Sequence, residues 1–158
     1  MELNGTDDYI ERIVRTYSGT LLRLAYTMLH SAADAEDAVQ EAFVRLITKK
    51  PEFSGSEHEK AWLIRVTVNI SRNMLKSAAR LSAPLDENLA SPEPESPGEL
   101  LDAVMKLPER YGTVMHLYYY EGYSIKEISD ILRLPAATVG TRLARGRTLL
   151  RISLEGEV

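Results

Sequence analysis

Four arginines lie close together near the C-terminal end of the sequence, on the stretch TVGTRLARGRTLLR at residues 138–151, which contains no acidic residue. A guanidinium group carries a fixed positive charge and donates hydrogen bonds in a planar fork that matches phosphate groups and the O6 and N7 atoms of guanine. Nothing within the stretch neutralises these charges. The residue types therefore favour binding of a polyanion, with nucleic acid as the first candidate.

Helical periodicity separates this stretch into two faces. A core-facing stripe consists of Val139, Leu143, Gly146 and Leu150. The opposite face consists of Ala137, Thr141, Ala144, Arg145 and Thr148. Small side chains allow a helix backbone to approach the DNA major groove, where Arg145 would reach a guanine, and Arg142 and Arg147 at the two edges would hold phosphates. On the core side, Gly146 would let a neighbouring helix come close.

A second short helix is predicted directly before this one. The sequence SIKE is a capping box, in which Ser124 and Glu127 satisfy the first backbone donors of a helix. The turn RLPAA follows, and Pro135 suits the first position of the next helix. These elements together predict a helix-turn-helix.

Composition places the chain among globular proteins. It has 158 residues, 44% of them hydrophobic and 27% charged, which suits one domain or two small ones. Cysteine is absent, which excludes disulfides. The N-terminal segment lacks the pattern of a signal peptide, and no apolar run approaches the length of a membrane span. We therefore expect a cytoplasmic protein.

The net charge of −4 is unevenly distributed. Residues 60–85 and 132–154 each contain five basic residues and no acidic one. Charges separated by more than about 10 Å are largely screened, so each basic segment acts as a local patch. Two sites for nucleic acid are compatible with this pattern, although taken alone it equally fits two solvated helix faces.

The two basic segments lie on either side of a break at residues 81–99, which hold four of the seven prolines and five acidic residues. We predict an all-α protein of two small helical domains, 1–80 and 100–158, joined by this acidic, Pro- and Ser-rich linker, which we expect to be flexible. In the first domain, helices are expected from Thr6 or Asp7, from a cap at Asp34, and from about Lys60.

No catalytic chemistry is indicated. The three histidines are scattered without metal-ligand spacing, and no phosphate-binding glycine loop or nucleophile–base motif occurs. We therefore expect neither an enzyme nor a metal site or cofactor.

Two motifs carry a family resemblance. LPERYGTVMHLYYYEGYSIKEISDILRLPAATVGTRLARGRTLL resembles region 4 of the extracytoplasmic-function (ECF, group IV) sigma factors of bacterial RNA polymerase. DAEDAVQEAFVRL resembles region 2.2 of the same family, and AWLIRVTVNISRNML resembles its regions 2.3 and 2.4. The motifs occur in the family order on either side of the acidic linker and cover about 120 of the 158 residues.

The resemblance implies a transcription initiation factor that directs core RNA polymerase to specific promoters. Residues implied to bind the clamp helices of the largest polymerase subunit are Asp34, Asp37, Gln40, Glu41 and Arg45. Residues implied to capture melted −10 DNA are Arg65, Asn69, Arg72, Asn73 and Lys76, with the loop 53–58, whereas Trp62 is expected to be structural. Residues implied to read the −35 duplex are Thr138, Thr141, Arg142, Ala144, Arg145 and Arg147. The resemblance also implies regulation by an anti-sigma factor, which in this family is frequently membrane-anchored.

Four positions depart from the family pattern, one of them Thr141, which replaces the usual serine. Gly140 replaces the usual Lys or Arg, which removes one −35 contact. Arg133 replaces the glycine of the turn and is expected to adopt a positive φ. Gly146 replaces the alanine of the usual RAR sequence.

Two alternatives stay open on the residues alone. One is a dimeric helix-turn-helix regulator that reads duplex DNA without polymerase, and the other is a helical module whose basic faces bind an acidic protein. Binding to core polymerase would separate both from a sigma factor.

Overall fold

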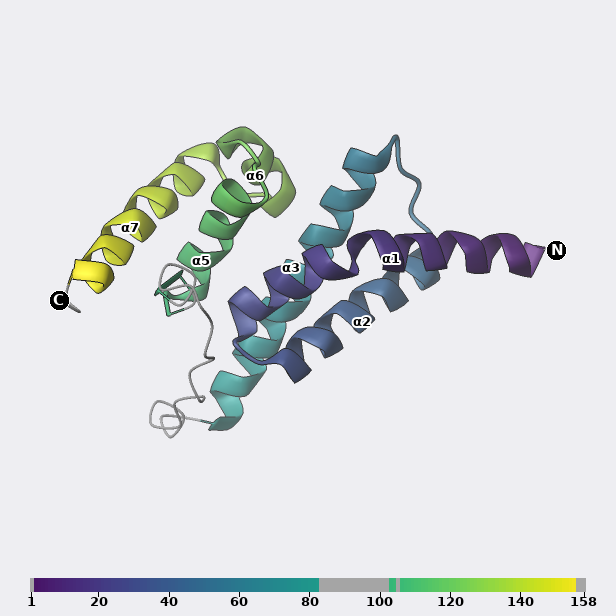
Figure 1. Ribbon diagram of the computed structural model, residues 1–158, viewed down its shortest axis with the longest axis horizontal. Coiled ribbons are helices and arrows are strands. Elements are labelled where there is room, and N and C mark those ends of the chain that lie inside the picture. The colour runs from purple at the N-terminus through teal and green to yellow at the C-terminus, as the bar shows by residue number, and fades with distance from the viewer. Residues whose placement is uncertain (1, 83–102, 105, 156–158) are drawn as a thin grey trace.

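The computed structural model describes residues 2–82, 103–104 and 106–155. Within these ranges the chain is helical and has no strand, so the predicted all-α class is confirmed. Three long helices form an N-terminal unit and shorter ones with a long final helix form a C-terminal unit, and the two termini lie at opposite ends of the molecule (Figure 1). No helix in the described part of the chain is long and apolar enough to cross a membrane.

The N-terminal unit contains α1 (Glu2–Leu29), α2 (Ala32–Lys49) and α3 (Ser56–Ser82), and each helix packs against the other two. Apolar residues at three- and four-residue spacing give each helix one buried stripe. The largest fully buried side chains of this unit are Ile13, Leu21, Leu24, Leu63, Ile64, Thr67 and Val68. This packing fixes the outward faces of α2 and α3.

The helix ends differ from those expected in three places. α1 begins at Glu2, before Thr6 and Asp7. The cap of α2 is Ser31, whose hydroxyl accepts a hydrogen bond from the backbone N–H of Asp34, so Asp34 lies inside the helix as an acid of the first turn. α3 begins at Ser56 rather than near Lys60. Glu57 and Glu59 lie in its first turn, where acidic side chains favour the start of a helix.

The C-terminal unit contains α5 (Glu109–Met115), a π-helical turn η2 (His116–Tyr120), α6 (Ile125–Leu132) and α7 (Ala136–Glu155). Its core consists of Leu107, Tyr111, Val114, Met115, Leu117, Ile128, Ile131, Val139 and Leu143. α7 packs against both α5 and α6, which holds the arginine-rich helix along its apolar stripe.

The two units are in contact, because α5 packs against α1 and α6 packs against α3. Buried residues of both units join in one hydrophobic cluster. The expected linker, residues 81–99, falls largely on positions 83–102, outside the described residues. The sequence predicted two helical domains and did not indicate how they lie relative to one another.

Candidate nucleic-acid interface

The turn that positions α7 has the predicted chemistry. Ser124 and Glu127 form the complete capping box at the start of α6, with hydrogen bonds of 2.8 and 3.1 Å. α6 ends where Arg133 adopts the left-handed conformation at φ 58°, ψ 47°, as expected for a residue that replaces glycine. The side chain of Ser129 donates to the carbonyl of Leu134 and closes the turn. The helix-turn-helix geometry is therefore built by local hydrogen bonds.

The arginine-rich helix exposes the face that helical periodicity predicted. Val139, Leu143 and Gly146 are buried against the C-terminal unit. Exposed on the other side are Thr141, Ala144, Arg145 and Arg147, while Thr138 and Arg142 are half-buried. The side chains expected to enter a major groove are thus free to do so.

Five of the six expected −35 residues line one of two separate hollows, and the sixth, Ala144, is exposed outside both. Thr138, Thr141, Arg142 and Arg145 line a common hollow of about 360 Å³. Arg147 instead donates to the hydroxyl of Tyr119 over 3.1 Å and lines a separate groove against α1. The structure therefore groups Arg142 with Arg145 and places Arg147 elsewhere.

The hollow also contains Arg110 and Tyr111 of α5, which the sequence did not single out. A cation in the first turn of a helix opposes the helix dipole. This unfavourable position of Arg110 is the signal by which the sequence could have singled it out. Its guanidinium lies 4.7 Å from the ring centre of Tyr111. The hydrogen-bonding influence of Arg110, followed by that of Arg145, lowers the pKa of the Tyr111 hydroxyl.

The expected −10 residues lie along α3 in two environments. Asn69, Asn73 and Lys76 are exposed. Arg65 and Arg72 are half-buried. Burial, followed by the neighbouring charge of Arg133, lowers the pKa of Arg65. Two of the three cations of the predicted face, Arg65 and Arg72, thus lie beside residues of the C-terminal unit.

Two carboxylates of the C-terminal unit pair with cations of α3. Glu109 accepts two hydrogen bonds from Arg72, at 3.3 Å from Nε and 3.1 Å from Nη2. Glu121 lies 3.4 Å from the ammonium group of Lys60, and its side chain is only 8% exposed. Each of these two cations is therefore paired with a carboxylate of the other unit.

The contact between the units is incompletely hydrogen-bonded. Nε2 of His116 and Oε2 of Glu121 lie 3.7 Å apart, beyond hydrogen-bond range. These two atoms and the hydroxyl of Tyr123 are buried without a hydrogen-bond partner among the described residues. Burial lowers the pKa of His116, against the raising effect of Glu121, so the neutral ring is favoured there. An unsatisfied buried polar group costs about 1–3 kcal/mol, which lowers the stability of this contact.

The loop between α2 and α3 is anchored by aromatic and polar contacts. Phe53 packs edge-on against His58 and Trp62, with ring centres 5.2 and 5.9 Å apart. Trp62 is half-buried in this cluster. The backbone N–H of Ser54 donates to Nδ1 of His58 over 3.1 Å. These contacts restrict the loop expected to approach melted DNA.

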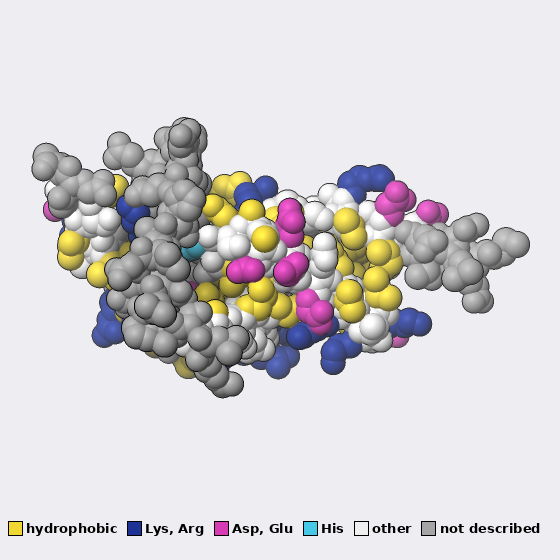
Figure 2. Space-filling model, turned by 90° about the horizontal axis from the view of Figure 1, so that it is seen from below, with side chains coloured by type: hydrophobic (Ala, Val, Ile, Leu, Met, Phe, Trp, Pro, Cys, Tyr) yellow, Lys and Arg dark blue, Asp and Glu magenta, His cyan; other side chains and the backbone are white. Residues whose placement is uncertain are grey.

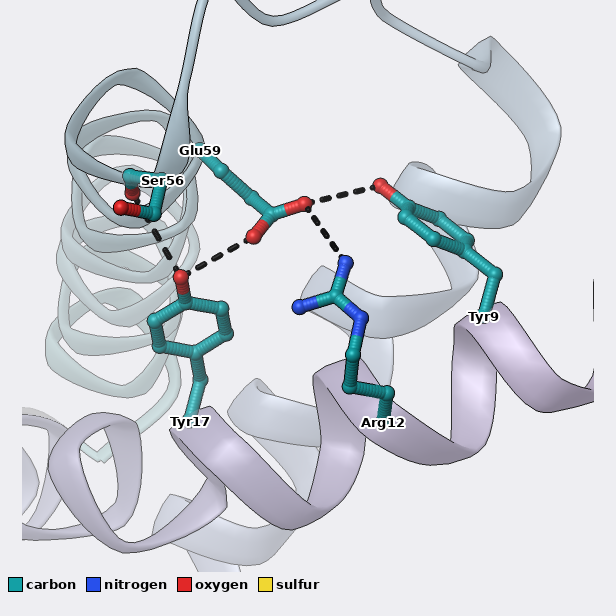
Figure 3. A network of polar contacts seen from close by, with 5 residues as sticks. All are labelled: Tyr9, Arg12, Tyr17, Ser56 and Glu59. Atoms are coloured by element: carbon teal, nitrogen blue, oxygen red, sulfur yellow. Dashed lines mark hydrogen bonds and ion pairs between the residues drawn. The ribbon is translucent and has the colours of Figure 1, made fainter.

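A buried carboxylate ties the start of α3 to α1 (Figure 3). Glu59 accepts hydrogen bonds from Tyr9 at 3.1 Å and Tyr17 at 3.0 Å, and Arg12 approaches it to 3.5 Å. The Tyr17 hydroxyl also lies 3.4 Å from the carbonyl of Ser56. Burial, reinforced by Glu59, raises the pKa of Tyr17 to about 12, so the hydroxyl remains a donor.

The face of α2 expected to bind polymerase is open. Asp34, Asp37, Gln40 and Glu41 are exposed, and Arg45, half-buried, pairs with Glu41 over 3.4 Å. Val44 and Ile47 on the same helix are 48% and 43% exposed. Figure 2 views the molecule from below, and there acidic side chains lie among hydrophobic ones. A surface of exposed aliphatic side chains beside acidic ones can be covered by a protein partner or stay in contact with water.

Among the described residues, no group of three or more His, Cys, Asp or Glu side chains is arranged to hold a metal ion.

Comparisons with known proteins agree on one family. The Sigma-70 region 2 model matches residues 13–81, and the Sigma-70, region 4 model matches residues 98–150. The ECF RNA polymerase sigma factor SigW of Bacillus subtilis is 31% identical over 171 residues, covering 95% of this chain and 91% of the relative. The RNA polymerase sigma-H factor of Pseudomonas aeruginosa is 26% identical, covering 90% of this chain and 84% of the relative.

A solved structure shares the fold. The sigma factor RpoE of Bartonella quintana, crystallised with the anti-sigma factor NepR, superimposes with a TM-score of 0.76 at 19% sequence identity. The match covers 92% of this chain and 96% of the other.

Proposed function

Because the chain belongs to the ECF group of RNA polymerase sigma factors, we propose that it recruits core RNA polymerase to a subset of promoters and helps to open them. Sigma factors are transcription initiation factors that bind core polymerase and promoter DNA, and the synthesis of RNA is the work of the polymerase. In this proposal residues 1–80 bind polymerase and the −10 element, residues 81–99 link the domains, and residues 100–158 read the −35 element. The protein would then act in the cytoplasm.

The exposed face of α7 is the observation that carries the proposal. Small side chains surround Arg145 on a helix presented by a capped α6 and a tight turn. Arg145 is the proposed base reader, and Arg142 beside it is a phosphate contact. On α3, the exposed amides of Asn69 and Asn73, one turn apart, are proposed to read an unstacked base of the −10 strand.

Division of labour between the free chain and the polymerase follows from the contact between units. Glu109 and Glu121 hold Arg72 and Lys60 in the free chain. Strand separation also costs a few kcal/mol per unstacked base, which a small protein does not readily supply alone. We propose that docking on polymerase separates the units and sets the spacing at which both DNA sites are engaged.

The test compares the free chain with its complex with core polymerase on promoter fragments selected from genomic DNA. The complex should bind specifically and make thymines near the start site reactive to permanganate, whereas the free chain should bind weakly and with strong salt dependence. Asn69→Ala should reduce opening more than −35 binding, and Arg145→Ala should do the reverse. Glu109→Gln with Glu121→Gln should strengthen binding of the free chain to the single −10 strand.

Two results would contradict this proposal. Tight specific binding by the free chain to half-sites about one helical turn apart would establish a dimeric regulator. Failure to bind core polymerase, together with capture of an acidic protein, would instead indicate an interaction module.

Regulation by an anti-sigma factor is a further part of the proposal. A groove of about 820 Å³ runs between α1, η2 and α7, and Arg23, Arg147 and Arg151 line it together with apolar and aromatic side chains. Tyr119 and Tyr120 beside it are 56% and 60% exposed. No acidic residue of the described chain lines the groove. Its chemistry fits an amphipathic helix with acidic flanks.

Charge reversal tests this surface. Two-hybrid selection would first identify a protein that inhibits run-off transcription directed by the wild-type chain. That protein should no longer inhibit transcription directed by the double variant Arg23→Glu with Arg151→Glu. Neither residue lies on the proposed polymerase-binding face of α2, so transcription itself should persist. Inhibition that survives both reversals would place the regulator on another surface.

A further inference from the structure

The spacing between α5 and α7 depends on Gly146. A Cβ atom at this position would lie 2.5 Å from the sulfur of Met115 and 3.5 Å from Cβ of Tyr111. The first distance is well inside van der Waals contact, so Met115 would have to move to accommodate even alanine. Glycine thus lets Met115 pack directly against the backbone of α7, and α5 lies correspondingly close.

This close approach brings the first turn of α5 beside the DNA-facing side of α7. Arg110 lines the same hollow as Thr138, Thr141, Arg142 and Arg145. Three guanidinium groups therefore surround one hollow, and three of its other lining residues, Tyr111, Thr138 and Thr141, carry hydroxyl groups. No acidic side chain of the described residues lines it.

The arginines of the hollow are not neutralised within the described part of the chain. Its ion pairs involve none of Arg110, Arg142 and Arg145. Glu109, next to Arg110 in sequence, points its carboxylate to Arg72 instead. A concave cluster of like charges with hydroxyl donors and no internal partner has the chemistry of a phosphate site.

Tyr111 restricts the orientation of Arg110. Its side chain is buried, and the guanidinium of Arg110 lies 4.7 Å from its ring centre. Stacking on an aromatic face reduces the side-chain entropy that an exposed arginine would lose on binding. Arg145 of α7 lines the same hollow as Arg110 and Tyr111.

We propose that Arg110 is a further −35 contact from outside the helix-turn-helix, binding a backbone phosphate next to the bases read from α7, and that Tyr111 positions it. A phosphate is the expected ligand because Arg110 lies on α5, at the rim of the interface, whereas base edges are reached from the helix that enters the groove. This inference rests on the proposed function of α7.

Salt dependence is the measurement that distinguishes this role. The probe is a duplex selected from a randomised −35 library by the complex of the full chain with core polymerase. Loss of one phosphate contact lowers the slope of log affinity against log salt concentration by about 0.9. Arg110→Ala should lower the slope by that amount and weaken binding several-fold at low salt, with unchanged base preference. Arg110→Lys should restore most of the slope.

Arg145→Ala and Tyr111→Phe complete the design. Arg145→Ala should relax base preference at one position, which Arg110→Ala should not. Tyr111→Phe keeps the ring and should retain most of the slope, while a change in circular dichroism would report any loss of folding. An unchanged slope in Arg110→Ala, or an altered base preference, would overturn the inference. If Arg145→Ala also has no effect, the proposed function itself fails.

Discussion

Replacement of Glu59 by alanine is expected to lower the free energy of unfolding by about 3 kcal/mol, because hydrogen bonds to a charged group contribute about 1.5–3 kcal/mol each. Glu59 is 6% exposed and joins Tyr9, Tyr17 and Arg12 of α1 to the first turn of α3. Without the carboxylate, the buried Tyr17 hydroxyl keeps only the 3.4 Å contact to the carbonyl of Ser56. Arg12 is largely exposed, so water can replace its partner.

Urea denaturation of the full chain measures this loss. Glu59→Gln keeps the shape and one acceptor and should cost less than Glu59→Ala. Glu36→Ala on the solvent side of α2 is the control and should change stability by no more than about 0.5 kcal/mol. If Glu59→Ala unfolds at the same urea concentration as the wild type, the network does not hold α1 to α3.

Charge reversal on α2, with Asp37→Lys and Glu41→Lys, is expected to weaken association with core polymerase by about 100-fold, since like charges placed across an interface cost several kcal/mol. Both side chains are exposed, so folding should change little. Glu41 also pairs with Arg45 in the free chain, and its reversal turns that pair into a repulsion on the docking face. Surface plasmon resonance with immobilised core polymerase gives the affinities.

A matched reversal separates position from net charge. Asp8→Lys with Glu11→Lys makes the same charge change on exposed residues of α1, outside the proposed docking face. That variant should bind polymerase almost as the wild type does. Equal losses for both variants would show that overall charge, and not the α2 face, governs association. Retained binding at physiological salt by the α2 variant would exclude this face.

Local features of the fold could be predicted from sequence because short-range interactions decide them. The capping box depends on Ser124 and Glu127 within one turn, and the positive φ of Arg133 follows from the tight turn that it occupies. The buried stripe of α7 and the close approach at Gly146 follow from helical periodicity. Errors at the helix starts arose where more than one polar residue could cap, as with Ser31 and Asp34.

Only part of each candidate site could be predicted from the sequence. The exposed face of α7 was predictable, since its residues share one helix. The family resemblance identified the candidate residues of α2 and α3. Taken alone, the polar faces of these helices are equally consistent with ordinary solvent-exposed surface. Arg110 was missed because it joins the hollow from another helix, and Glu59 was missed because nothing in its surroundings along the chain predicts burial.

The sequence by itself determined the helices, their faces and the family, because periodicity, capping and motif order are properties of neighbouring residues. Only the tertiary structure decided which polar groups meet: Arg72 with Glu109 across 37 positions, and Glu59 with Tyr17 across 42. Such pairs depend on how the helices pack. The packing is set by shape complementarity of the whole core, which cannot be deduced from any single segment. The same packing covers part of the cationic face of α3 and leaves that of α7 open.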